Sequence, residues 1–130
     1  MIKPTLQIGD PKLKAPNSAV KNFASPNIKR IIKDLKDTMR ENQLIGIAAP
    51  QIGYNLKLFV TEPRKTKTRI GNSDQFRVYI NPKITLYSNE QSIIYEGCGS
   101  VLNGQLFGPV QRPALITIQA RDDEDQKFQL

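Results

Sequence analysis

Apolar residues recur at helical spacing in one stretch near the amino terminus. Five of them fall at i, i+3, i+4, i+7 and i+11 and so share one helix face: Ile28, Ile31, Ile32, Leu35 and Met39. The preceding Ser25-Pro26 pair supplies an N-cap and then a proline where a helix tolerates one. We therefore expect an amphipathic helix from about Pro26 to Asn42, with its apolar stripe packed against a core.

The pattern after this helix is that of short β-strands separated by turns. The predicted strands are residues 56–61, 76–80, 84–87, 92–95 and 114–119. Turn residues punctuate them at 71–74, 81–82, 88–89, 103–104 and 122–123, and the opening residues 5–20 read as an extended arm with turns. One helix followed by strands and hairpins predicts an α+β fold with a mostly antiparallel sheet. One helix cannot cover so many strands, so we expect a further element on that sheet.

Length and composition narrow the function classes. A chain of 130 residues fits a single domain, and it has no apolar run near the roughly 18–20 residues of a membrane span. Its opening residues lack the apolar segment of a secretory signal, and its single Cys cannot form an internal disulfide. We therefore expect a protein that is neither secreted nor membrane-bound. The chain contains no His, which excludes His-based catalysis and any His-containing metal site built from this chain alone.

The formal net charge of +7 suits an acidic partner, but the basic residues are scattered apart from the run Arg64–Arg69. No aromatic residues are interleaved there to stack on bases. A solvated basic loop is the favoured interpretation, a patch that meets nucleic acid or the ribosome is the alternative, and specific nucleic-acid binding is not predicted. The acidic run 122–125 is interpreted in the same way, as a solvated hairpin tip rather than a cation site.

Two segments have compositions that suggest chemistry. In Ile45–Gly53, small residues allow close approach to the backbone, and Gln51 offers an amide donor and acceptor. Pro50 is expected to keep Gln51 out of any helix. On composition alone, a tight crossing of two strands explains this segment better than a binding site.

The second segment is Glu96–Ser100, in which Cys98 lies between two glycines. A lone Cys is more often a small buried apolar residue, but flexible neighbours and a nearby carboxylate favour an accessible thiol. As a nucleophile it lacks a His base, and as a metal ligand it lacks two or three companions. Neither role is complete within the chain.

Taken together, Gly-Ile-Ala-Ala-Pro-Gln at 46–51 and Glu-Gly-Cys-x-Ser at 96–100 resemble the first two sequence motifs of the peptide deformylases. The resemblance covers nearly the whole chain. Flanking matches to the family are residues 6–11 with Leu13, Asn81-Pro82, and residues 110–113 with 116–120.

The resemblance implies a fold, an activity and a set of site residues. The family removes the formyl group from the N-terminal formyl-methionine of nascent proteins, with Fe²⁺, or Zn²⁺, Ni²⁺ or Co²⁺, held by one Cys and two His. Cys98 would be the metal ligand, and the Gln51 amide and the Gly99 N–H would bind the oxyanion. Other residues would contact the substrate, which lies alongside as an added strand: Ile45, Gly46, Ile94 and Glu96, with Arg112 paired to Glu96. The expected partners are a formyl-methionyl peptide and, as a further candidate, the ribosome surface, in a bacterial cytoplasm or an organelle.

The chain also departs from the family pattern. Leu44 stands where the first motif normally begins with Gly, and Gly99 stands where the second usually has Leu. The third motif, His-Glu-x-x-His on a later helix, is missing together with its helix. We therefore expect residues 1–130 to form a single, C-terminally incomplete deformylase-like domain that is inactive alone and binds no metal tightly. A non-catalytic homologue that binds peptides or the ribosome is the alternative, and an unrelated basic nucleic-acid binder is a weaker one.

Overall fold

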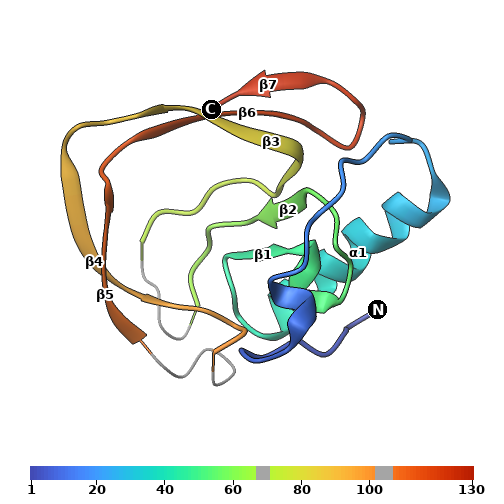
Figure 1. Ribbon diagram of the computed structural model, residues 1–130, viewed down its shortest axis with the longest axis horizontal. Helices are drawn as coiled ribbons and strands as arrows, with labels where there is room; N and C mark the ends of the chain where they lie inside the picture. The colour runs from blue at the N-terminus through green and yellow to red at the C-terminus, as the bar shows by residue number, and fades with distance from the viewer. Residues whose placement is uncertain (67–70, 102–106) are drawn as a thin grey trace.

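The predicted amphipathic helix is present as α1, Pro26–Glu41, in a computed structural model that describes residues 1–66, 71–101 and 107–130 (Figure 1). Ser25 caps the helix, its side-chain oxygen accepting a hydrogen bond from the Asn27 N–H. The apolar face packs on β1, β2 and a short 3₁₀-helix. Its stripe is fully or nearly fully buried: Ile28, Ile31, Ile32, Leu35 and Met39.

The carboxyl end of α1 closes in a hydrogen-bonded turn. Gln43 has φ 53°, in the left-handed region. The Gln43 N–H donates to the Arg40 carbonyl at 3.2 Å, and the Leu44 N–H donates to the Met39 carbonyl at 2.9 Å. These two bonds form a Schellman motif, which fixes the path of the chain as it enters the first strand.

The strands form two antiparallel sheets (Figure 1). The five-stranded sheet has the order β1-β2-β3-β6-β7, and its members are β1 (Gly46–Ala48), β2 (Leu58–Thr61), β3 (Arg77–Tyr87), β6 (Ile116–Arg121) and β7 (Lys127–Gln129). The second sheet pairs β4 (Gln91–Gly97) with β5 (Phe107–Pro113). Two 3₁₀-helices complete the elements of the described residues, η1 (Pro11–Leu13) and η2 (Ala49–Ile52). The α+β, mostly antiparallel prediction is confirmed.

The turn predicted at Asn81-Pro82 is wrong. Residues 77–80 of the first predicted strand and residues 84–87 belong to one strand, β3, whose register to β6 shifts between Ile80 and Lys83. Asn81 lies at this irregularity with φ 52°, a conformation that Asn tolerates. Its side chain accepts from the Val20 N–H at 2.8 Å and donates to the Val20 carbonyl at 2.9 Å. The turn-forming pair therefore makes a bulge that fastens the amino-terminal arm to the sheet.

Part of the sheet surface is uncovered by other described residues, as its strand count led us to expect. The β4–β5 hairpin curves away from α1, on the left of Figure 1. Exposed apolar side chains, between 38 and 76% accessible, lie on this hairpin, on the neighbouring part of β3, and at or just before the start of β6: Ile84, Leu86, Tyr87, Ile93, Ile94, Tyr95, Leu115 and Ile116. Over the described residues, no helix has the length and apolarity needed to cross a membrane.

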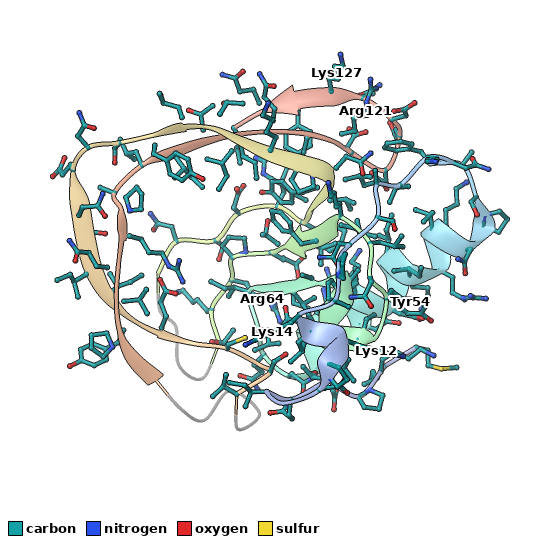
Figure 2. The ribbon with its side chains drawn as sticks, viewed as in Figure 1. Lys12, Lys14, Tyr54, Arg64, Arg121 and Lys127 are labelled. Atoms are coloured by element: carbon teal, nitrogen blue, oxygen red, sulfur yellow. The ribbon has the colours of Figure 1, made fainter. Side chains whose placement is uncertain are left out.

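The charged runs have different surroundings. Residues 67–69 of the basic run lie outside the described residues, while Arg64 donates to the Leu44 carbonyl at 2.7 Å and so belongs to the fold. The labelled basic residues of Figure 2 are spread out, with Arg121 and Lys127 on the β6–β7 hairpin and Lys12 and Lys14 near η1. The acidic run 122–125 forms the turn between β6 and β7, which confirms the predicted hairpin tip.

Candidate functional site

Gln51 lies in η2, directly after β1, and its side chain is held in one orientation. The expectation that Pro50 excludes Gln51 from a helix is wrong, because a proline near the start of a helix lacks only an N–H that would have no helical partner. The Gln51 Oε1 accepts a hydrogen bond from the Ala48 N–H at 2.9 Å. With the oxygen committed to the backbone, the amide nitrogen points to the opposite side.

That nitrogen faces the second motif. Gln51 Nε2 lies 3.1 Å from Ser100 Oγ and 3.6 Å from Cys98 Sγ. Ser100 is buried, whereas Cys98 is exposed. The structure therefore brings together a carboxamide and a thiol that are 47 residues apart in the chain, and it leaves the thiol accessible.

The amino-terminal arm lies between the two motifs and bonds to both. The Leu6 N–H donates to the Gln51 carbonyl and the Ile8 N–H to the Ser100 carbonyl, each at 2.7 Å. Between them, Gln7 Nε2 donates to the Gly99 carbonyl at 2.9 Å. The arm thus sets the spacing between the segment that carries Gln51 and the segment that carries Cys98.

Sequence reasoning missed two residues of this arrangement, Ser100 and Gln7. Ser100 had a signal, because it is the last residue of the Glu-Gly-Cys-x-Ser pattern. Gln7 had none beyond its place in a flanking match, since an exposed-looking arm gives no reason to expect contact with a motif 92 residues away.

Gly46 lies on the open edge of the five-stranded sheet, where β1 is the outermost strand of the described residues. The Ile45 carbonyl accepts from the Glu62 N–H on the β2 side at 2.8 Å. Because hydrogen-bonded and non-hydrogen-bonded pairs alternate along antiparallel strands, the backbone groups of Gly46 point toward the open edge. This edge can accept an added strand.

The other residues predicted to contact the substrate lie nearer the protein surface than Gln51 and Ser100 do. Ile45 and Ile94 are 39 and 56% accessible, so neither lines an enclosed pocket within the described residues. Arg112 forms a two-point ion pair with Glu96, with Nε and Nη2 at 2.7 and 2.8 Å from the carboxylate oxygens. The hydrogen bonds from Arg112 hold the pKa of the Glu96 carboxyl below its ordinary value.

The residues present do not by themselves fit a divalent metal. Cys98 is the sole thiol, the sequence has no His, and the described residues contain no group of three or more Cys, Asp or Glu side chains that could hold an ion. A single thiolate cannot outcompete water for such a cation, because catalytic sites use at least three protein ligands. Two further ligands would have to come from outside these 130 residues.

Comparison with known proteins identifies the family. The sequence profile described as polypeptide deformylase matches residues 2–130. The chain is 35% identical over 126 residues to the peptide deformylase of Rhizobium meliloti, covering 97% of this chain and 68% of that protein. It is 31% identical over 121 residues to the chloroplastic peptide deformylase 1B of Solanum lycopersicum, covering 93% of this chain and 41% of that protein.

Solved structures agree with the sequence match. The peptide deformylase of Ehrlichia chaffeensis, crystallised in complex with actinonin, superimposes with a TM-score of 0.88 at 25% identity. The alignment covers 99% of this chain and 73% of the other. The chain thus spans about two thirds to three quarters of these two bacterial proteins. A family profile that matches almost every residue, over a fold that superimposes on a solved member, establishes that this chain belongs to the peptide deformylase family.

Proposed function

We propose that this chain supplies the substrate-facing part of a peptide deformylase site and has no hydrolytic activity alone. The reaction is hydrolysis of the formyl group at an N-terminal formyl-methionine, which adds water across the formyl C–N bond and yields formate and a free amine. The observation that carries the proposal is the fixed orientation of the Gln51 amide, with Nε2 directed at Cys98 and Ser100.

Each site residue has a role in this proposal. One N–H of the Gln51 amide bonds to Ser100, and the other is directed toward the exposed thiol, where it can donate to the oxyanion formed on the formyl carbon. The Gly99 N–H is the second proposed donor. The peptide pairs with the edge of β1 at Gly46, its methionine side chain lies against Ile45 and Ile94, and the Arg112–Glu96 pair supports that side of the site.

Cys98 is the one residue of this chain that would ligate the family's metal. The other ligands belong to the His-Glu-x-x-His motif, which this sequence does not contain. We propose that residues 1–130 act as one domain that becomes catalytic only with such a segment, supplied in the same polypeptide or by another chain.

The test is a comparison of the chain with and without a metal-binding segment. Formate release from formyl-Met-Ala-Ser is measured for the 130-residue chain with Fe²⁺, Zn²⁺, Ni²⁺ or Co²⁺, and for a fusion that adds a His-Glu-x-x-His helix after Leu130. We expect no release by the chain alone and release by the fusion. Matched controls are the fusion with both His changed to Gln, the fusion with Cys98→Ala, and the fusion with the exposed Ser73→Ala.

Two results would overturn the proposal. Turnover by the chain alone, with one tightly bound metal per chain, would show that the ligand set is complete without His. A folded fusion that binds metal but releases no formate, whatever the substrate concentration, would show that the site is not a deformylase site.

A non-catalytic peptide-binding module is the second candidate. The open edge at Gly46 beside the exposed Ile45 favours it, because strand addition requires neither metal nor thiol. Saturable binding of Met-Ala-Ser to the metal-free chain, measured by calorimetry, together with an inactive fusion would support this function over the first.

A further inference from the structure

Leu44 and Gly99 are complementary in size and lie in contact across the site. A Cβ atom placed on Gly99 would lie 2.8 Å from Leu44 Cδ1 and 3.5 Å from Leu44 Cδ2. Ordinary contact between carbon atoms is about 3.5–4.0 Å, so even alanine at position 99 would meet the Leu44 side chain. The backbone of Gly99 is not in the left-handed region, so the requirement for glycine here is one of space.

The backbone of Leu44 is tied to the end of α1. Its N–H is bonded to the Met39 carbonyl in the Schellman motif, and its carbonyl accepts from Arg64 Nη1 at 2.7 Å. Its side chain is half-buried and packs on the core. The Leu44 backbone is therefore held from the α1 side, and its side-chain methyl groups pack from there against Gly99.

Gly99 is held equally firmly from the other side. Its carbonyl accepts from Gln7, and the next carbonyl, that of Ser100, accepts from the Ile8 N–H. Thr5 closes the same space, because its Cγ2 would lie 3.6 Å from a Cβ on Gly99. Relief of a clash at this point takes either a rotation of the half-buried Leu44 side chain or displacement of the segment that also carries Cys98 and Ser100, and the spectra described below distinguish the two.

We propose that Leu44 is a positioning residue for the site: its contact with Gly99 sets the distance between the Gln51 amide and the Cys98–Ser100 segment. The margin is small. Moving Gly99 far enough to bring 2.8 Å to an ordinary contact takes about 0.7 Å, and a similar shift of Ser100 would lengthen its 3.1 Å bond to Gln51 beyond hydrogen-bond range. The inference goes beyond the proposed function and does not depend on it, because it concerns geometry that exists without substrate or metal.

The same contact gives a physical reason for the two departures from the family pattern. The first motif has a large residue, Leu44, where glycine is usual, and the second has glycine, Gly99, where leucine is usual. In this chain the leucine side chain that packs between the two motifs comes from the first motif.

The test is a double-mutant cycle on the 130-residue chain. Gly99→Leu is expected to lower Tm by roughly 5 °C or more, because it overpacks a held segment. Leu44→Ala is expected to lower Tm through lost packing, and the double variant Leu44→Ala/Gly99→Leu is expected to be clearly more stable than the sum of the two single effects. Gly99→Ala serves as a milder variant if Gly99→Leu does not fold.

A second measurement separates positioning from mere stability. The side-chain NH₂ signals of Gln51 in a ¹H–¹⁵N spectrum report its bonds to Ser100 and Cys98. We expect Gly99→Leu or Gly99→Ala to shift them and Leu44→Ala to return them toward the wild-type position in the double variant. The matched control is Gly108→Ala, since a Cβ on Gly108 meets nothing within 4 Å among the described residues and should leave the Gln51 signals unchanged.

Additive effects on Tm would overturn the proposal, because they would show that Leu44 and Gly99 do not interact. Unchanged Gln51 signals in a folded Gly99 variant would also overturn it, because the contact would then affect stability without affecting the site.

Discussion

The carboxamide nitrogen of Gln51 lies 3.1 Å from the hydroxyl oxygen of Ser100, and this contact joins the two sequence motifs of the site. Ser100 is buried, 5% accessible, while Gln51 reaches it from a 3₁₀-helix on the far side of the arm. A buried hydroxyl that accepts from an amide fixes that amide in direction as well as in place. The hydroxyl thereby orients the group that the proposed chemistry requires.

Ser100→Ala should therefore lower stability and release the Gln51 amide. The loss of one part-buried hydrogen bond is expected to cost about 1 kcal/mol in the free energy of unfolding. Urea denaturation followed by circular dichroism measures this cost. Ser73→Ala, on the exposed surface, is the control and should change the free energy of unfolding by less than about 0.5 kcal/mol. An equal effect of both variants would show that the Gln51–Ser100 bond contributes nothing.

The Asn81 bulge leads to a prediction that separates backbone from side-chain effects. Asn81→Ala removes both bonds to Val20 and places alanine at φ 52°, so it should cost about 2–4 kcal/mol. Asn81→Gly removes the same bonds but accepts the backbone conformation, so it should cost about 1 kcal/mol less than alanine. Chemical denaturation of the two variants measures the difference. Equal losses would place the whole effect in the side-chain bonds.

The end of α1 offers a stabilising substitution. Gln43 occupies the left-handed C′ position of the Schellman motif, where glycine is the preferred residue. Gln43→Gly should raise the free energy of unfolding by about 0.5–1 kcal/mol, since it relieves strain that any side chain experiences there. The converse variant is Gly53→Ala, at φ 98°, which should lower stability. Thermal or urea unfolding that moved both variants in one direction would contradict the argument.

The ion pairs of Asp37 should make the stability of the fold depend on pH. Its carboxylate accepts from the Met1 ammonium at 2.6 Å and from Lys33 at 2.9 Å, and these bonds lower its pKa from 3.8 to about 2. A pKa that is lower in the folded state means that the stabilisation is complete above about pH 4 and is lost as pH falls toward 2. The Met1 amino group shows the opposite sign: its raised pKa gives a contribution that is present below pH 8 and lost as pH rises through the raised value.

An NMR titration of the Asp37 carboxyl carbon tests this directly. The expected midpoint is about 2, and a midpoint near 3.8 would refute the pairing. Asp37→Asn should flatten the fall in stability between pH 4 and 2. The comparison is Asp123→Asn at the hairpin tip, since Asp123 lies outside the ion pairs found among the described residues. Because these groups are exposed, the difference should shrink at high salt.

The parts of the fold that could be predicted from sequence are those governed by local periodicity. The α1 stripe, from Ile28 to Met39, fixes the helix, because burial and backbone preference agree along it. The bulge at Asn81 could not be predicted, because its cause is a bond to Val20, 61 residues away. A turn signal shows that the backbone can deviate from a strand, but tertiary contacts decide whether the strand actually ends there.

In the candidate site, too, some residues could be predicted from sequence and others could not. The motif patterns identified Gln51 and Cys98, and the structure places them in contact. Gln7 and the Leu44–Gly99 pair could not be found in this way, because their importance lies in contacts between segments that have no shared pattern in sequence. The distance between two motifs is set by what packs between them, and that packing is visible only in three dimensions.

A substitution at Gly46 should change peptide binding without changing the stability of the fold. A Cβ on Gly46 would lie 3.5 Å from the Val60 carbonyl oxygen and 3.7 Å from Thr61 Cγ2, which are ordinary contacts, and its φ is not in the left-handed region. The fold of this chain therefore does not require glycine there. Gly46→Ala should leave the free energy of unfolding within about 0.5 kcal/mol of wild type.

The same substitution should weaken peptide binding, because an added strand at the edge of β1 must approach the backbone of residue 46 closely. Calorimetric titration with Met-Ala-Ser is expected to give a Kd raised about tenfold, which corresponds to about 1.4 kcal/mol. Gly108→Ala on β5, where a Cβ meets no atom of the described residues within 4 Å, is the matched control and should bind as wild type does. Unchanged affinity in Gly46→Ala would place the peptide elsewhere, whereas lost stability with unchanged affinity would show that glycine serves the strand crossing that composition alone had favoured.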